Sequence, residues 1–420
     1  MGDLGDEAAD GAVDTLEPLR GKHVAFLSWR DTRNPEGGGA ERYLEKMAAG
    51  LVARGCRVTI FCAAHAAAPP EEVVDGIRFV RRGSKLSVYP AGMRALASGE
   101  LAGGGQGEVD LVVDVQNGLP FFSRLVTRKP VVVLVHHVHR EQWPVVYSGL
   151  TARVGWWIER RLAPWLYRRN QYVAVSRATR SELRELGVRG PRVAVVHNGT
   201  DPVVPVDPGK APTPTIAVVG RLVPHKQVEH AIDAALTLRA EHPDLRLHVV
   251  GGGWWEAQLQ EYARSHGAGD TVVFEGHVDE ARKHEVYERA WLLVLPSLKE
   301  GWGLVIGEAG MHATPTVAYR SAGGTQESVA DHRSGLLVDA PEELTAAIGL
   351  LLRDREERER LGKGAREMSH AYTWQHAQHS FALVVLAALE GTPVDSQDPE
   401  DPDEVLAPRR RRRGPGRKRG

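Results

Sequence analysis

The sequence predicts an α/β protein made of two doubly wound domains, and three observations support this prediction. Short apolar runs rich in Val, Ile and Leu alternate with longer segments of helical periodicity, first over residues 21–200 and again over residues 215–371. Runs that are apolar on both faces are typical of parallel strands with helices packed on each side. A segment with five prolines, residues 201–214, separates the two series and predicts a linker. The length of 420 residues also fits two domains.

The first series begins with an apolar run that is followed by an amphipathic segment. Residues 40–54 carry Leu44, Met47, Ala48 and Leu51 on one helical face, which predicts a helix directly after the first strand. We expect strands at residues 23–28, 57–62, 109–115, 131–137, 172–176 and 192–197.

The second series repeats this alternation after the linker. We expect strands at residues 215–219, 246–250, 271–274, 291–296, 315–319 and 335–338. We expect helices at residues 227–241, 254–266, 279–290, 304–313, 341–353 and 355–370, with an amphipathic segment, residues 372–390, after them. Ligands of doubly wound domains bind beyond the carboxyl ends of the strands, so two such domains predict a site in a central cleft between them.

Composition excludes several classes of protein. The chain has 53 Lys and Arg against 54 Asp and Glu, a net charge of −1, so any attraction to nucleic acid or anionic lipid must be local. The two cysteines, Cys56 and Cys62, are too few for a disulfide scaffold or a four-cysteine zinc site. We expect both to be buried thiols in a reducing cytoplasm.

The two ends of the chain differ in composition from the domains. Residues 1–20 hold six acidic residues and predict a disordered acidic head, unlike a signal peptide. Residues 391–420 predict a disordered tail, first acidic and then basic, with eight basic residues in 409–419. The stretch Arg409–Arg419 could bind nucleic acid or anionic lipid, or it could pair with the acidic run before it. The longest apolar run, residues 381–389, is too short to span a bilayer, which predicts a soluble or peripheral protein.

The most informative stretch surrounds two glutamates, Glu300 and Glu308, that lie eight residues apart. Glycines at 301 and 303 allow a sharp turn after the strand, so that a helix can begin near Leu304 with Glu308 on its second turn. Carboxylates accept hydrogen bonds from the hydroxyls of sugars and ribose, and the N–H groups of Gly303 and Leu304 open a helix N-terminus that favours a phosphate. The alternative is that the two acids only stabilise the start of the helix.

Two loops supply features that suit a diphosphate. Arg221 and Lys226 follow the first strand of the second domain, where two cations could hold a diphosphate or form ordinary surface charge. Gly37, Gly38 and Gly39 follow the first strand of the chain and open a helix, which allows a close backbone approach to an anion. This loop matches neither the dinucleotide fingerprint nor a Walker A loop, and a plain turn is an equal alternative.

Three histidines, His136, His137 and His139, follow a predicted buried strand. Neighbouring residues of a strand face opposite sides, and no acidic or cysteine partner is arranged with them, which argues against a metal site. Neutral histidines that donate hydrogen bonds in the cleft fit better, with structural histidines as the alternative.

Residues 151–170 predict a helix with three Trp and five Arg. Trp and basic residues together are typical of helices that lie in a membrane interface. The alternative is a core helix that packs its Trp face on the sheet and keeps its Arg in water.

The order of these motifs resembles the retaining glycosyltransferases of family 4, which have the GT-B fold, over residues 22–389. The sequence EGWGLVIGE carries the Glu-x7-Glu pattern of the family, and Gly323–Gly324 matches its glycine turn. Further matches in order and position are the Arg221–Lys226 loop, the Gly37–Gly39 loop, the segment VSRAT at 175–179 and the segment VVHNG at 195–199.

The resemblance implies a role for each matching residue. Arg221 and Lys226 would grip the donor diphosphate, Glu300 would contact hydroxyls of the donor sugar, and Glu308 would bind the ribose. The Gly37–Gly39 loop would lie near the phosphate and the acceptor. His136 best matches a histidine that contacts the donor sugar, with His137 as its rival. Residues 274–280, with Val278 and Asp279, would hold the base through backbone contacts, and the last helix would cross back onto the first domain.

The resemblance also implies the reaction. A hexose would move from a UDP- or GDP-sugar to the hydroxyl of a glycan, lipid or small molecule with retention of configuration, in polysaccharide or glycoconjugate biosynthesis in the cytoplasm. No Asp-x-Asp motif lies at an expected strand end and two cations are present instead, so we expect activity without a metal or other cofactor. A peripheral position on the inner membrane face would follow from an interfacial helix at 151–170. The alternatives are a nucleotide-sugar epimerase or related GT-B enzyme, and a nucleic-acid-binding protein that uses the Arg-rich tail.

Overall fold

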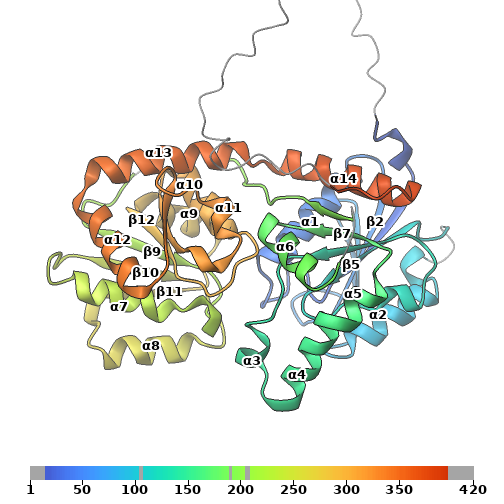
Figure 1. Cartoon of the computed structure of the whole chain (residues 1–420), viewed down its shortest axis with the longest axis horizontal. Coiled ribbons are helices and arrows are strands. Elements are labelled where there is room, and N and C mark those ends of the chain that lie inside the picture. The colour runs from blue at the N-terminus through green and yellow to red at the C-terminus, as the bar shows by residue number, and fades with distance from the viewer. Residues whose placement is uncertain (1–14, 104–106, 189–191, 204–208, 396–420) are drawn as a thin grey trace, which may run out of the picture.

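The computed structural model describes residues 15–103, 107–188, 192–203 and 209–395, which form two α/β domains side by side (Figure 1). Each domain has one sheet with helices on both faces, which confirms the predicted fold class. The topology explains the sequence pattern, because strands buried on both faces read as continuous apolar runs.

The N-terminal sheet has eight strands in the order β3-β4-β2-β1-β5-β6-β7-β8. All neighbours are parallel except β3, which pairs antiparallel with β4. The strands are β1 (His23–Leu27), β2 (Arg57–Cys62), β3 (Glu71–Val74), β4 (Ile77–Arg81), β5 (Leu111–Gln116), β6 (Val131–Val135), β7 (Gln171–Ala174) and β8 (Val193–Val195). The six expected strands are all present.

The hairpin β3–β4 was not expected. Asp75 and Gly76 form its turn, both with positive φ, 50° and 79°. An Asp-Gly pair with two positive φ angles is a typical two-residue hairpin turn. Because β3 is an edge strand that exposes Val73 and Val74, its side chains do not show the apolar run that identifies the central strands.

The helices of the N-terminal domain begin with the expected one after β1, and several others were not expected. The surface helix at 151–170 begins two residues earlier than predicted and ends at Leu166, with a π-helical turn inside it. The elements are α1 (Gly39–Val52), α2 (Val88–Ala97), α3 (Trp143–Val146), α4 (Gly149–Trp157), the π turn Ile158–Leu162, α5 (Ala163–Leu166) and α6 (Arg177–Glu185).

The C-terminal sheet has six parallel strands in the order β11-β10-β9-β12-β13-β14. Its strands are β9 (Thr215–Val219), β10 (Arg246–Val250), β11 (Val272–Gly276), β12 (Leu292–Leu295), β13 (Thr316–Tyr319) and β14 (Gly335–Val338). Its helices are α7 (Val228–Leu238), α8 (Glu256–Ser265), α9 (Glu280–Arg289), α10 (Leu304–Met311), α11 (Thr325–Ser328), α12 (Pro341–Arg353) and α13 (Arg355–Ala371). Every strand and helix expected after the linker is present within a few residues of its predicted ends.

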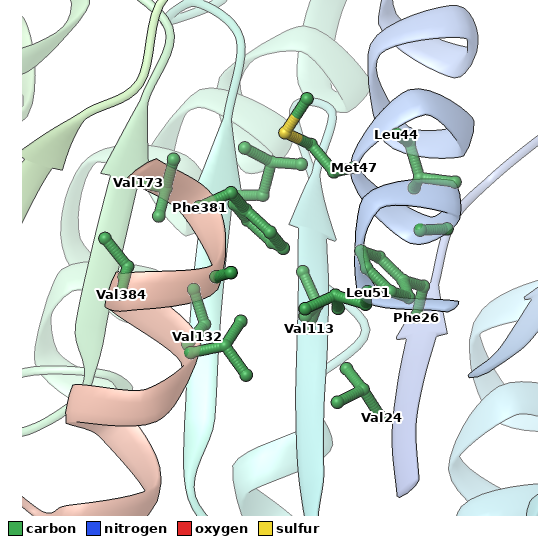
Figure 2. Packing of buried hydrophobic residues seen from close by; sticks show 14 of the residues in the cluster. Val24, Phe26, Leu44, Met47, Leu51, Val113, Val132, Val173, Phe381 and Val384 are labelled. Carbon is green, nitrogen blue, oxygen red and sulfur yellow. The ribbon is translucent and has the colours of Figure 1, made fainter. Parts of the chain in front are cut away.

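The last helix, α14 (Trp374–Glu390), crosses to the N-terminal domain, as predicted (Figure 1). Phe381 and Val384 of α14 pack among Val132 of β6, Val173 of β7 and the apolar face of α1 (Figure 2). The ring of Phe381 lies 6.1 Å from that of Phe26 in β1. The C-terminal end of the chain therefore completes the core of the first domain.

Two predicted boundaries were wrong. Residues 15–20 do not belong to a disordered head, because Leu16 and Leu19 are buried in the N-terminal core. Residues 391–395 do not belong to a disordered tail, because the N–H of Val394 donates to Gln171 and Asp395 pairs with Arg180. The predictions for residues 1–14 and 396–420, including Arg409–Arg419, fall outside the described residues.

Cys56 and Cys62 are free and buried, as predicted, and burial raises the pKa of the Cys56 thiol to about 11. Within the described ranges, none of the helices combines the length and the apolar character that crossing a bilayer requires.

We expect Phe381→Ala to destabilise the protein by about 3–5 kcal/mol, because it leaves a cavity between α14 and β1. The control is Leu383→Ala on the same helix, where the side chain is 39% exposed and the expected loss is under about 1 kcal/mol. Urea unfolding measures both free energies. Equal losses would show that α14 does not hold the N-terminal core together.

Candidate active site

The predicted site residues gather where the carboxyl ends of strands from both sheets meet. β1 lies between β2 and β5, and β9 lies between β10 and β12, so in each sheet the chain order reverses beside these strands. Such a switch point is where doubly wound sheets bind ligands. The Gly37–Gly39 loop follows β1, and the Arg221–Lys226 loop follows β9.

Glu300 and Lys226 come together from the ends of β12 and β9. Lys226 Nζ lies 2.5 Å from Glu300 Oε1, and the Glu300 side chain is only 10% exposed. The backbone of Glu300 is held by the turn that follows β13, since its N–H donates to Ala322 and its carbonyl accepts from Gly324. The carboxylate is thus fixed in place with one cation beside it.

Arg221 reaches the glycine loop of the other domain. A Cβ atom on Gly38 would lie 3.4 Å from Arg221 Nε, and one on Gly39 would lie 2.9 Å from Leu304 Cδ1. The loop therefore packs against both the arginine side chain and Leu304 at the start of α10. The N–H of Gly38 donates to Glu41 Oε2 at 2.8 Å, so a carboxylate of the chain itself already occupies part of this helix N-terminus.

The loop around Arg221 is rich in positive charge. Surrounding protein and the neighbouring Arg30 lower the pKa of Arg221, although this guanidinium stays protonated at neutral pH. Burial, followed by Lys226 and Arg221, lowers the pKa of His225 to about 4. His225 is therefore neutral at pH 7, and the charge of the loop comes from Arg221 and Lys226.

Glu308 lies on the second turn of α10, as predicted, and is 12% exposed. Its Oε2 accepts from the Tyr287 hydroxyl at 2.9 Å and lies 3.2 Å from Lys283 Nζ. Its Oε1 lies 3.4 Å from Arg42 Nη1, which comes from α1 of the other domain. Arg42 Nη2 also lies 2.5 Å from Asp201 Oδ2. Glu308 therefore belongs to an ionic network between the domains.

The remaining predicted residues flank Glu308. Gly303 caps α10 with φ 88°, a left-handed conformation that glycine adopts readily, and Leu304 is the first residue of the helix. Val278 and Asp279 precede α9, the helix that carries Lys283 and Tyr287. The Asp279 side chain caps this helix by accepting from the N–H of Arg282 at 2.8 Å.

The three histidines have different surroundings. His136 is 9% exposed, with its ring edge-on to Tyr43 of α1 at 5.3 Å, and burial lowers its pKa to about 4. Its Nε2 is buried without a hydrogen-bond partner among the described residues. His137 is half-buried, and its ring lies 4.2 Å from that of His139, tilted by 32°. Its Nε2 lies 3.1 Å from Gln142 Oε1, and burial lowers its pKa well below the ordinary value. Both members of the His136–His137 pair are therefore neutral at pH 7.

The sequence analysis missed Glu327 of α11. This buried carboxylate accepts from the N–H groups of Arg177 and Ala178 at 2.8 and 2.9 Å, and from His197 Nε2 at 3.0 Å. All three partners belong to the N-terminal domain, and all three lie in the segments 175–179 and 195–199 that match the family. The glutamate itself follows the Gly323–Gly324 turn by three residues, which was the only signal available.

No group of three or more His, Cys, Asp or Glu side chains within the described residues is arranged to hold a metal ion. His137 and His139 instead hydrogen-bond to amide and carboxylate side chains.

Two family models match the chain. "Glycosyltransferase Family 4" matches residues 37–204, and "Glycosyl transferases group 1" matches residues 206–368. These matches meet at the linker and together cover both domains. Both models describe glycosyltransferases, and each matches one of the two domains.

The chain is 32% identical over 237 residues to the glycogen synthase of Mycobacterium tuberculosis, an alignment that covers 54% of this chain and 56% of that protein. The chain thus spans about half the length of the curated relatives it matches. Its fold is similar to sucrose-phosphate synthase of Thermosynechococcus elongatus, with a TM-score of 0.76 and 21% identity over 88% of this chain and 100% of that one. It is also similar to Anabaena HepE in complex with UDP-glucose, with a TM-score of 0.68 and 19% identity over 87% and 99% of the two chains.

We expect Glu327→Gln to cost about 1–3 kcal/mol of stability, because an amide oxygen cannot serve two N–H groups and a histidine as a carboxylate does. The matched control is Glu343→Gln, an exposed glutamate that accepts from the N–H of Asp339 at 2.9 Å. Thermal and urea unfolding compare the two. Similar small losses in both variants would contradict a stabilising contact between the domains.

The loss of stability caused by Glu327→Gln should become smaller at acidic pH. Burial raises the pKa of Glu327, but the bonds from His197 and the two N–H groups outweigh it and hold the pKa below its ordinary value of 4.5. A carboxylate with a lowered folded pKa stabilises the protein above its unfolded pKa and loses this contribution as the pH falls through the folded value. The gap between wild type and Glu327→Gln should stay constant from pH 6 to 8 and narrow below about pH 4.5.

Proposed function

We propose that the protein is a retaining hexosyltransferase that moves a sugar from a UDP- or GDP-sugar to a hydroxyl acceptor without a divalent metal. The observation that carries the proposal is the convergence of two cations and two carboxylates from separate elements. Arg221 lies beside the glycine loop, Lys226 lies beside Glu300, and Glu308 lies one helical turn beyond the start of α10. The complex of Anabaena HepE with UDP-glucose supports the same class of donor.

The proposed chemistry follows from the leaving group. The bond between the anomeric carbon and the diphosphate breaks, and negative charge develops on the leaving phosphate. Arg221, Lys226 and the N-terminus of α10 are positioned before the reaction to stabilise this charge. The acceptor oxygen bonds to the anomeric carbon on the face that the phosphate leaves, and its proton passes to the leaving phosphate oxygen.

Glu300 and Glu308 divide the recognition of the donor. Glu300 would accept hydrogen bonds from sugar hydroxyls while Lys226 neutralises it, and Glu308 would accept from the ribose. Val278 and Asp279 would hold the base through their backbone. The donor sugar would meet His136, which best matches the family histidine, with His137 as the alternative.

The proposal also covers the cellular location, the biosynthetic role and the class of acceptor. The enzyme would act in the cytoplasm in polysaccharide or glycoconjugate biosynthesis, on a glycan, lipid or small-molecule acceptor. A peripheral contact of residues 151–170 with the inner face of the membrane, and anion binding by Arg409–Arg419, complete it.

The test of the proposal is release of nucleoside diphosphate from a panel of UDP- and GDP-hexoses. Release should rise when an accepted hydroxyl acceptor is added, and it should stay within about twofold after EDTA, because Arg221 and Lys226 supply the positive charge. No release from any nucleotide sugar would overturn the transferase. Full loss with EDTA that magnesium or manganese restores would overturn the metal-independent reaction.

Replacing Glu300 and replacing Glu308 should impair different steps of the reaction. Glu308→Ala should weaken nucleoside diphosphate binding by about 1–3 kcal/mol, since a charged hydrogen bond to the ribose is lost. Glu300→Ala should lower turnover strongly and change nucleotide affinity little. Calorimetric titration and initial rates separate these effects, with the exposed Glu359→Ala as control. Near-wild-type affinity and turnover in both variants would refute the assigned roles.

A further inference from the structure

Large apolar side chains gather on one part of the N-terminal domain. Twelve such side chains are exposed among the described residues, and five of them lie within residues 145–165. Leu150 is 74% exposed, Trp157 55% and Trp165 61%. A concentration of this kind marks a surface that binds a partner, whereas single exposed apolar residues are ordinary.

The exposed residues form one stripe along the helix. Leu150, Val154, Trp157, Arg161 and Trp165 follow one another at intervals of three or four residues. The π turn Ile158–Leu162 takes more residues per turn than an α-helix and so keeps Trp165 in line with Trp157. We call Leu150, Val154, Trp157, Arg160, Arg161 and Trp165 the basic tryptophan face.

The only acidic residue between Gln142 and Ser181 points away from this face. Glu159 is buried, where it accepts from the N–H of His139 and from Trp143 Nε1. The face therefore shows no negative charge of its own. Through its contact with His139, Glu159 connects the helix to residues 136–139 of the candidate site.

The positive charges of the helix lack acidic partners. Arg153, Arg160, Arg161, Arg168 and Arg169 are all exposed. Across the described part of the chain, none of them forms an ion pair with Asp or Glu, whereas many other exposed arginines do. Arg168 instead lies over the ring of Trp165 at 5.3 Å.

We propose that the basic tryptophan face binds the surface of an anionic lipid bilayer. Tryptophan rings settle at the boundary between headgroups and acyl chains, and unpaired arginines attract anionic headgroups. Helices α3 and α4 form the edge of the N-terminal domain opposite α14, an outlying position that can meet a flat surface (Figure 1). The inference names the residues and the lipid chemistry of the contact proposed above, and it does not depend on the sugar-transfer reaction.

Vesicle sedimentation without nucleotide sugar tests this inference. The full chain should sediment with phosphatidylcholine:phosphatidylglycerol vesicles (7:3) at 0.1 M NaCl, and not with pure phosphatidylcholine. Trp157→Ser with Trp165→Ser should reduce the partition coefficient at least about tenfold, because two interfacial anchors are lost. Arg160→Gln with Arg161→Gln should reduce it similarly, and 0.5 M NaCl should weaken wild-type binding.

Matched controls lie elsewhere on the surface. Trp254→Ser removes a tryptophan that is 58% exposed in the C-terminal domain, and Arg264→Gln removes an arginine that is 75% exposed at its side chain. Neither should change binding, and every variant should keep the wild-type melting temperature within about 2 °C. Because residues 409–419 remain in all variants, vesicle binding that survives both double substitutions would assign the contact to another part of the chain. Absence of binding to anionic vesicles would also overturn the inference, and would leave the face to a protein partner.

Discussion

The candidate site exists only while the two sheets face each other, and the buried carboxylate of Glu327 is the most specific contact that holds them so. The first N–H groups of a helix have no partner within the helix, and a buried one must find a partner elsewhere. In α6, Ser176 Oγ accepts from the N–H of Thr179, while Glu327 of the other domain accepts from Arg177 and Ala178. Separating the domains here would break three hydrogen bonds to one buried carboxylate at once.

Other contacts between the domains are more open to water. Arg42 and Asp201 are each about 30% exposed, whereas the Glu327 side chain is 6% exposed. Ion pairs in water contribute little and are screened by salt, while buried hydrogen-bonded charges are costly to separate. Lys299 of the Glu300 loop adds a further pair, with Glu182 of α6. The junction is therefore held more firmly beside α6 than beside Glu308.

This asymmetry matters for Glu308. Its contact with Arg42 is 3.4 Å, while Arg42 lies 2.5 Å from Asp201. A ligand hydroxyl at Glu308 could therefore take the place of Arg42 without costing the arginine its shorter bond. Tyr287 and Lys283, from the same domain as Glu308, keep the carboxylate oriented in either case.

The sequence predicted the repeating elements well because strands buried on both faces and amphipathic helices each leave a local pattern. Strand and turn signals singled out Glu300, Glu308, Arg221 and Lys226 separately, and the family resemblance grouped them. The structure brings Glu300 and Lys226 into contact. The hairpin β3–β4 carried a usable signal, the Asp75–Gly76 pair, that was overlooked. Contacts between domains leave no such pattern: nothing near Arg42 indicates Glu308, and nothing near Glu327 indicates His197.

The histidine pair shows where a strand pattern stops being informative. Val132 and Leu134 pack with α1 and α14 on one face of the sheet, and Val131, Val133 and Val135 pack on the other. The alternation places His136 on the first face, where it meets Tyr43, and His137 on the second. Because both faces are equally apolar, the sequence could not tell which histidine would emerge from the core. His136 and His137 differ in how far the sheet face on which each lies is covered beyond the end of β6. This coverage depends on α1 and on a loop from the other domain.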